Sequence, residues 1–154
     1  MLCGGRSELE RRTGDAILAA MAARDGVLDL IGKDTLKQLP ALLARADLLV
    51  TPDSGPMHIA NAMGTKVLGL HAATNPHRSG PYSDRRWCVD RYDDAARRYR
   101  GKPASELKWG AKIEHDGVMA LITVDDAIAA FERRRAGLAD RAMRGAQRAG
   151  APHR

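Results

Sequence analysis

The sequence predicts an α/β protein in which helices cover a parallel, doubly wound sheet. Short apolar runs at 47–51 and 66–71 alternate with segments whose apolar residues recur at helical spacing, as in parallel sheets with helical crossovers. Aromatic residues make up only 4% of the chain, so the core must consist mainly of aliphatic side chains and methionine. A length of 154 residues fits one domain of ordinary size.

The first third of the chain is expected to hold two strand segments and two helices. A strand end is expected at 1–5 and a helix at 7–23. A short strand is expected at 27–31, and a second helix after Thr35. Ser7 is the expected N-cap of the first helix, with Glu8 and Glu10 in its first turn. The leucine face from Leu36 to Leu43 is assigned to the core.

The middle and end of the chain continue the alternation of strands and helices. A buried strand is expected at 47–51, a helix at 57–63 and a second buried strand at 66–71. A loop at 72–86, a short strand at 87–89 and an irregular stretch at 90–116 follow, and a helix is expected at 123–135. Thr123 is the expected N-cap of the last helix, whose apolar positions are Ala127, Ile128 and Phe131. Gly64 is expected to end the helix at 57–63.

Positive charge is concentrated at the C-terminal end. The net charge is +6, and the stretch 133–154 carries seven arginines against a single acid, Asp140. We therefore divide the chain into a domain at 1–136 and a basic extension at 137–154, interpreted as a flexible, solvated tail. Binding of this tail to an anionic lipid surface or to nucleic acid stays an alternative, although no aromatic residues interleave with the arginines to form a base-stacking platform.

The remaining composition favours a cytoplasmic protein without a metal centre. Cys3 and Cys88 are far apart and lack metal-ligand spacing, which is typical of free thiols in a reducing compartment. No apolar run approaches the ~20 residues that a membrane-spanning helix needs, and residues 1–5 are too short for a signal peptide. The sequence has neither an Asp-x-Asp pair nor a His/Cys cluster of metal-ligand spacing.

The segment most informative about chemistry passes from a strand through a turn into a helix at 47–60. In an open parallel sheet, ligands bind at the carboxyl ends of the strands, where this turn is expected to lie. Ser54 and Gly55 allow a close approach of the backbone, and Pro56 suits the first turn of a helix. The free N–H groups and the helix dipole then form an anion site, most naturally for phosphate, to which His58 can add a hydrogen bond or a charge. Alternatively, Asp53 serves as an N-cap and His58 as a packing residue.

The same residues carry a resemblance to a known family. The run Asp-Ser-Gly-Pro-Met-His at 53–58, preceded by an apolar strand and followed by Gly-Thr-Lys-Val at 64–67, resembles glycosyltransferase family nine, the lipopolysaccharide heptosyltransferases and their relatives. Two further landmarks fall in the family's order, Thr-Asn-Pro at 74–76 and Gly-Pro-Tyr at 80–82. The resemblance extends from Gly4 to about Arg135. At 71–73, His-Ala-Ala stands where the family usually has an aromatic residue followed by Gly-Pro.

The resemblance implies a GT-B enzyme in which two Rossmann-like domains face a cleft. This chain resembles the C-terminal, donor-binding half, and the donor is commonly ADP-L-glycero-D-manno-heptose. Glu8 matches a residue that contacts the donor ribose, Lys33 lies where the adenine is expected, and Thr74 lies near the pyrophosphate. The residues that the resemblance assigns to the donor diphosphate and sugar are Asp53, Ser54, Gly55, Pro56, Met57 and His58.

The resemblance also implies what this chain is expected to lack. The opening strand of this donor-binding domain is expected to be missing. The acceptor site and the Asp expected as general base would lie in an N-terminal domain, so no catalytic residue is assigned here and the isolated chain is expected to be inactive. The reaction implied is an inverting transfer to lipopolysaccharide core or another glycan acceptor, without metal or cofactor. Expected partners are the nucleotide-sugar and the N-terminal domain, with a peripheral contact to the inner membrane left open and no nucleic acid. A non-catalytic nucleotide- or phosphate-binding module is the alternative function.

Overall fold

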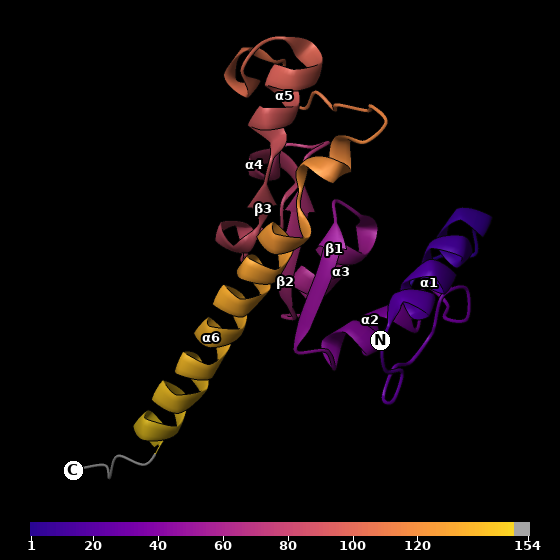
Figure 1. The fold of residues 1–154 in the computed structure, drawn as a ribbon. Helices are drawn as coiled ribbons and strands as arrows, with labels where there is room; N and C mark the ends of the chain where they lie inside the picture. Colours follow the sequence, from indigo (N-terminus) through magenta and orange to yellow (C-terminus); the bar gives the residue numbers. More distant parts are fainter. Residues whose placement is uncertain (150–154) are drawn as a thin grey trace. The chain divides into compact units, whose positions relative to one another are not determined.

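The computed structural model describes residues 1–149, and side chains as far as Gly137. The chain forms two compact units, Met1–Leu42 and Leu43–Arg154, each of which is described by itself. Figure 1 shows the elements of both units, coloured by their place in the sequence. The second unit contains the sheet and is therefore the part in which a strand-end site is to be sought.

The first unit is built around helix α1, Glu8–Ala20. Ser7 is its N-cap, as predicted, because the Ser7 hydroxyl accepts from the Glu10 amide at 3.2 Å. The Glu10 carboxylate reaches back to the Gly5 amide at 2.8 Å, so the pair forms a reciprocal cap of the kind that satisfies orphan helix donors. The helix ends three residues before the expected Ala23.

The strand predicted at 27–31 is reduced to one isolated bridge. Leu2 pairs in parallel with Asp29, and its N–H and C=O bond to Leu28 and Leu30. Beyond this bridge the two segments share one more backbone hydrogen bond, from the Gly32 amide to the Gly4 carbonyl at 3.0 Å. The segments 1–5 and 27–31 therefore pair in parallel, as the predicted parallel sheet requires.

Helix α2, Leu39–Ala44, starts later than expected. Thr35 hydrogen-bonds with Gln38 in a turn ahead of the helix, so Leu36 lies outside the helical face. The assignment of the whole Leu36–Leu43 face to the core is therefore wrong at Leu36, whose surface is 77% exposed. Leu39 and Leu43 are buried, as predicted.

A parallel three-stranded sheet forms the centre of the second unit. Its strands are β1, Leu48–Pro52, β2, Lys66–His71, and β3, Val89–Asp90, in the order β1-β2-β3. Helix α3, Gly55–Ala62, connects β1 to β2 and ends before Gly64, whose φ of 82° suits a glycine. These elements confirm the predicted α/β class. Strand β1 is not buried as predicted, since it lies at the edge of this sheet and Val50 is 47% exposed.

The segment between β2 and the last helix is more ordered than the sequence suggested. The predicted loop holds α4, Pro76–Ser79, and a short 3-10 helix, Arg85–Trp87. The stretch expected to be irregular contains α5, Tyr92–Arg100, and a 3-10 turn, Ala104–Glu106. Helix α5 was missed because its buried face is made of Tyr92, Ala95 and Ala96, and small alanines give a weak apolar signal among many charged residues.

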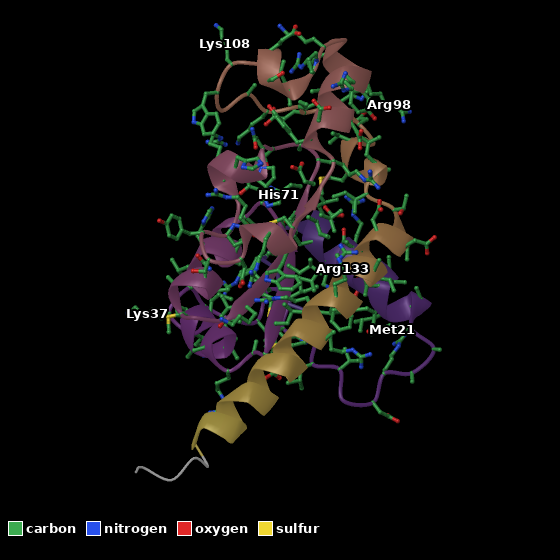
Figure 2. The ribbon with its side chains drawn as sticks, turned by 90° about the vertical axis from the view of Figure 1, so that its left-hand side faces the viewer. Met21, Lys37, His71, Arg98, Lys108 and Arg133 are labelled. Carbon is green, nitrogen blue, oxygen red and sulfur yellow. The ribbon has the colours of Figure 1, made fainter. Side chains whose placement is uncertain are left out.

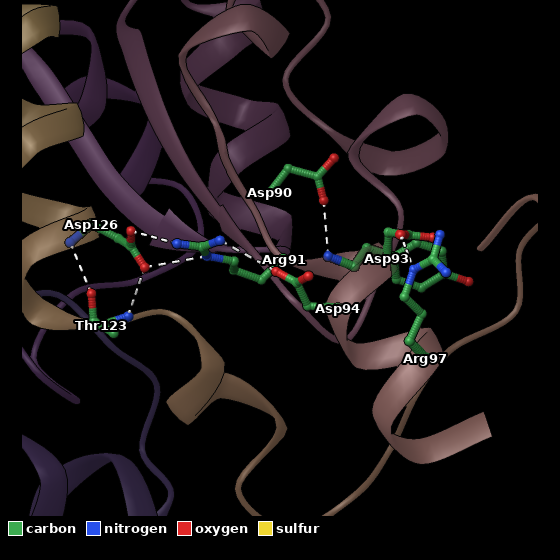
Figure 3. Close-up of polar contacts among 8 residues, drawn as sticks. Asp90, Arg91, Asp93, Asp94, Arg97, Thr123 and Asp126 are labelled. Atoms are coloured by element: carbon green, nitrogen blue, oxygen red, sulfur yellow. Dashed lines mark hydrogen bonds and ion pairs between the residues drawn. The ribbon is translucent and has the colours of Figure 1, made fainter. Parts of the chain in front are cut away.

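Helix α6, Val124–Ala149, follows a 3-10 turn at Val118–Leu121 and runs past β2 and β3 (Figure 1). Thr123 caps it as predicted, because its hydroxyl accepts from the Asp126 amide at 3.0 Å. The Asp126 carboxylate in turn binds the Arg91 guanidinium at 2.6 Å, which ties the start of α6 to the segment between β3 and α5 (Figure 3). The helix continues through the expected boundary at Gly137. The side chains beyond that residue lie outside the described part, so the basic extension at 137–154 stays a prediction.

The buried face of α6 differs from the predicted one. Ile128 and Phe131 are 54% and 39% exposed, whereas Ala130 and Arg134 are 2% and 1% exposed. Ala130 packs with Leu68 and Val89 of the sheet. The apolar-face rule therefore failed here because the helix buries an arginine on its inner side.

Arg134 forms an ion pair in the interior of the second unit. Its Nη2 lies 2.6 Å from Oδ1 of Asp84, and both side chains are almost fully buried. The other oxygen of Asp84 accepts from the amide of Val67 at 3.0 Å, and the Arg134 guanidinium stacks over Trp87 at 4.7 Å. One carboxylate thus joins α6 to the start of β2.

We expect Arg134→Met to lower the free energy of unfolding by about 3–5 kcal/mol, because it leaves the Asp84 carboxylate buried without its guanidinium partner. Urea denaturation followed by circular dichroism measures the change. Arg135→Met is the matched control, since Arg135 pairs with Glu132 at the surface and its loss should cost less than about 1 kcal/mol. Equal losses in the two variants would contradict a structural role for the buried pair.

Candidate functional site at the strand ends

The turn from β1 into α3 presents an uncapped helix N-terminus. Ser54 occupies the N-cap position in extended conformation, yet its side chain makes no capping hydrogen bond. Its hydroxyl lies instead 2.9 Å from the hydroxyl of Thr51. A Cβ added at Gly55 would meet no atom within 4 Å, so open space lies beside the first residue of the helix. Pro56 has no N–H, and the Met57 amide donates to the Ser54 carbonyl at 3.2 Å, so this turn offers an anion the Gly55 amide and the positive end of the helix dipole.

Asp53, the first residue after β1, accepts hydrogen bonds from hydroxyl groups. Ser79 of α4 donates to its Oδ2 at 2.6 Å, and Nε2 of His58 lies 4.0 Å from its Oδ1. Partial burial raises the pKa of Asp53, but hydrogen bonds from Ser79 and Thr74 and the nearby imidazoles of His71 and His58 outweigh that effect and lower it. The carboxylate is therefore ionised at neutral pH.

The neighbouring strand ends in His71, which is fully buried. Figure 2 places it in the interior of the second unit, whereas Arg98 and Lys108 lie at the surface. Its Nδ1 lies 3.3 Å from the hydroxyl of Thr74. Burial lowers the pKa of His71, and the carboxylates of Asp53 and Asp90 offset this only in part, so the imidazole is neutral at physiological pH.

The structure brings together most of the site residues expected from the sequence. Asp53, Ser54, Gly55, Pro56 and His58 lie on one partly exposed turn, and Thr74 joins them through Asp53. Met57 is fully buried and supports the helix from inside.

Two expected residues belong to the first unit. The exposed side chain of Glu8 lies 3.9 Å from Arg12, and Lys33 donates to the backbone oxygen of Asp29 at 2.9 Å. They are therefore described apart from the strand-end cluster, by which we mean the turn at 53–58 with His71, Thr74 and Ser79.

Sequence reasoning missed His71 and Ser79 as members of this cluster. The sequence analysis assigns no role to His71, although it is the last residue of β2, a strand predicted correctly to the residue. Its place at the carboxyl end of that strand was the available signal. Ser79 stands next to the Gly-Pro-Tyr landmark, and only the fold of α4 carries it to Asp53.

Two further features of the described residues bear on reactivity. Burial raises the pKa of the Cys88 thiol to about 11, which makes it a poor nucleophile. Among the described side chains, no group of three or more His, Cys, Asp or Glu residues is arranged to hold a metal ion. Within the same part of the chain, no helix is both long and apolar enough to cross a membrane.

Comparison with known proteins agrees with this arrangement. Residues 1–110, which include the whole strand-end cluster, match glycosyltransferase family 9 (heptosyltransferase). The chain belongs to glycosyltransferase family 9. Its parallel α/β sheet is consistent with a fragment of a Rossmann-like GT-B glycosyltransferase.

Curated members of the family with similar sequences are bacterial heptosyltransferases. Lipopolysaccharide core heptosyltransferase OpsX of Haemophilus influenzae is 42% identical over 105 residues, which is 68% of this chain and 30% of that protein. Lipopolysaccharide heptosyltransferase 3 of Escherichia coli is 30% identical over 110 residues, which is 70% of this chain and 29% of that protein. Lipopolysaccharide heptosyltransferase 2 of Salmonella typhimurium is 32% identical over 79 residues, 50% of this chain and 23% of that protein.

The chain thus spans less than a third of the length of the curated relatives it matches. No solved structure matches it significantly. The family assignment therefore applies to the part of the protein described here, and the activity of the whole protein is a matter for proposal.

We expect the free energy of unfolding to fall as the pH is lowered below about 6.5, the ordinary pKa of histidine. The pKa of His71 is lowered in the folded state, so the unfolded chain binds more protons in this range and low pH favours unfolding. Urea denaturation at a series of pH values from 7.5 to 5 measures the slope. In His71→Asn the slope should be smaller, and a variant with the wild-type slope would show that His71 is not the source.

Proposed function

We propose that this chain is the donor-binding domain of an inverting glycosyltransferase that transfers a sugar from a nucleotide-sugar to a lipopolysaccharide acceptor. The donor proposed is ADP-heptose, because the family and its similar members are named as heptosyltransferases. The observation that carries the proposal is the uncapped N-terminus of α3 beside open space at Gly55, at the carboxyl end of a parallel strand.

The start of α3 fits a diphosphate for electrostatic reasons. The helix dipole concentrates positive potential at its first turn, and an anion there can accept a hydrogen bond from the Gly55 amide. Pro56 in the first turn removes no hydrogen bond that the helix itself needs. The side chain of His58 is 53% exposed on this turn and is free to contact the same anion.

Asp53 fits a different part of the donor. An ionised carboxylate repels phosphate, but it accepts hydrogen bonds from sugar hydroxyls. Ser79 occupies Oδ2 of Asp53, whereas Oδ1 faces the side of His58. We therefore assign the diphosphate to the helix N-terminus and the sugar to Asp53, with Thr74 beside them. For Glu8 and Lys33 we keep the ribose and adenine roles that the family resemblance implies.

On this proposal, the acceptor site and the general base belong to an N-terminal domain of the full-length protein. Transfer then proceeds by direct displacement, in which the base deprotonates the acceptor hydroxyl and α3 and His58 stabilise the leaving diphosphate. On this proposal the chain alone binds donor without turnover and needs no metal. The proposed location is the cytoplasmic side of the inner membrane, where its acceptor would be assembled.

Isothermal titration calorimetry of the chain with ADP and with UDP tests the proposal. We expect ADP to bind preferentially, equally well with EDTA or with Mg²⁺, and His58→Ala to weaken binding about tenfold or more, because a hydrogen bond to a charged group is lost. His77→Ala is the control, since His77 is an exposed histidine outside the proposed contacts. No binding of either nucleotide to the folded chain would count against a donor site within it.

Substitution of Gly55 separates ligand binding from folding. We expect Gly55→Ala to leave the thermal midpoint unchanged, because its methyl group meets no atom of the protein, and to weaken ADP binding because the methyl enters the proposed ligand space. Gly64→Ala is expected to behave in the opposite way, since its positive φ strains any side chain at a position outside the site. Unchanged ADP affinity in Gly55→Ala would place the ligand elsewhere.

A further inference from the structure

Positive charge without ion-pair partners gathers on the second unit between the end of α5 and residue 112. The stretch 97–112 carries six Lys and Arg residues against a single acid, Glu106. Among the described residues, one of the six forms an ion pair, namely Arg97, whose Nε lies 2.7 Å from the Asp93 carboxylate (Figure 3). The other five cations of this stretch are therefore available to an external anion.

The fold brings cations from separate elements to one short segment at 110–112. A Cβ built at Gly110 would lie 3.3 Å from Cδ of Arg78, so this side chain of α4 runs alongside Gly110. Nη2 of Arg100, the last residue of α5, donates to the backbone oxygen of Lys112 at 3.4 Å. Arg78, Arg100 and Lys112 thus meet at the same few residues, although they are far apart in the sequence.

This segment is fixed to the body of the second unit. The hydroxyl of the buried Tyr92 donates to the backbone oxygen of Ala111 at 2.8 Å. The amide of the buried Ile113 donates to the backbone oxygen of Ala73, shortly after β2, at 2.8 Å. Because the backbone is already held in place, an anion that binds its cations need not order the segment first.

An exposed tryptophan lies among these charges. Trp109 is 74% exposed, and it directly follows the exposed Lys108. Figure 2 shows Lys108 at the same end of the second unit as Arg98 of α5. An indole has an apolar body and a polar N–H, and such rings are enriched where a membrane meets water. The basic surface, as we call it, consists of Arg78, Arg100, Lys108, Trp109 and Lys112.

We propose that the basic surface binds a bilayer that contains anionic phospholipid. Its four cations attract the lipid phosphates, and the ring of Trp109 enters the headgroup region. A single-stranded nucleic acid fits less well, because it stacks its bases on several rings along a basic groove. Tyr99, the other aromatic residue of the stretch 97–112, is already stacked on His115, with the ring centroids 4.2 Å apart.

The basic surface adjoins the strand-end cluster through α4. Arg78 belongs to the surface, and the next residue, Ser79, donates to the Asp53 carboxylate at 2.6 Å. A bilayer bound here therefore lies beside the candidate site. That this brings a lipid-linked acceptor close to the donor rests on the proposed function, whereas binding of the bilayer does not.

Sedimentation of the full chain with lipid vesicles tests the proposal. We expect binding to vesicles of equal parts phosphatidylcholine and phosphatidylglycerol, weaker binding as salt is added, and none to phosphatidylcholine alone. Lys108→Glu combined with Lys112→Glu should weaken binding about tenfold or more, because two attractive charges become repulsive. Lys37→Glu combined with Arg45→Glu is the matched control. It changes the net charge equally at exposed residues outside the basic surface, and the affinity should stay within about twofold of the wild type.

Tryptophan fluorescence reports whether the surface itself meets the lipid. The chain has two tryptophans, and the other one, Trp87, packs against the Arg134 guanidinium. Emission of the wild type should move to shorter wavelength with the anionic vesicles, because the ring of Trp109 leaves water. Trp109→Phe should abolish this shift and keep the wild-type circular dichroism spectrum, since the replaced side chain is exposed.

Several results would overturn the proposal. They are equal affinity of the wild type and the Lys108/Lys112 double variant, an emission that does not respond to the vesicles, and absent or equal binding to the two kinds of vesicle. Equal affinity would place lipid binding elsewhere, as in the arginine-rich stretch 133–154.

These measurements contain no nucleotide, so they are independent of the ADP titration. Vesicle binding without ADP binding would refute the proposed donor site and leave the basic surface standing. ADP binding without vesicle binding would do the reverse.

Discussion

The parallel pairing of β1 with β2 is the constraint on which the candidate site depends. The register aligns Leu48 with Lys66 and Pro52 with Leu70, so the residues that follow the last pair, Asp53 and His71, come from the same edge of the sheet. Antiparallel pairing, or a shift by one residue, would separate them or turn one side chain to the opposite face. The contact between His71 and Thr74, the hydrogen bond from Ser79 to Asp53 and the entry into α3 all depend on that alignment.

The sequence predicted this part of the fold well because the local preferences of its residues agree with the positions that they take in the folded structure. Strand β2 is a continuous apolar run, α3 ends at a glycine of positive φ, and Ser7 and Thr123 cap helices as their side chains favour. The turn at the end of β1 was found because the order of Ser, Gly and Pro there suits a helix start.

Prediction failed where tertiary context outweighed the local pattern. Helix α5 buries small alanines, and α6 buries Arg134 while Phe131 is partly exposed, so an apolar-face rule misassigns both. The partner of Arg134 is 50 residues away along the chain, a distance at which no periodicity can signal an ion pair. Membership of Ser79 in the site likewise depends on a contact across 26 residues. Sequence patterns find the strand ends, but only the fold selects the side chains that meet there.

The interior ion pair lies at the start of β2, and the strand-end cluster lies at its other end. At its start, β2 is fixed by the Asp84 carboxylate, whose two oxygens are both bonded, one to the Val67 amide and one to the Arg134 guanidinium. At its end, His71 keeps one nitrogen without a partner, and the adjoining turn leaves a helix N-terminus uncapped. Unsatisfied polar groups cost stability, and proteins retain them chiefly where a ligand or a mechanism uses them. A rigid start of β2 therefore allows its other end to hold donors and acceptors in a fixed arrangement before any ligand binds.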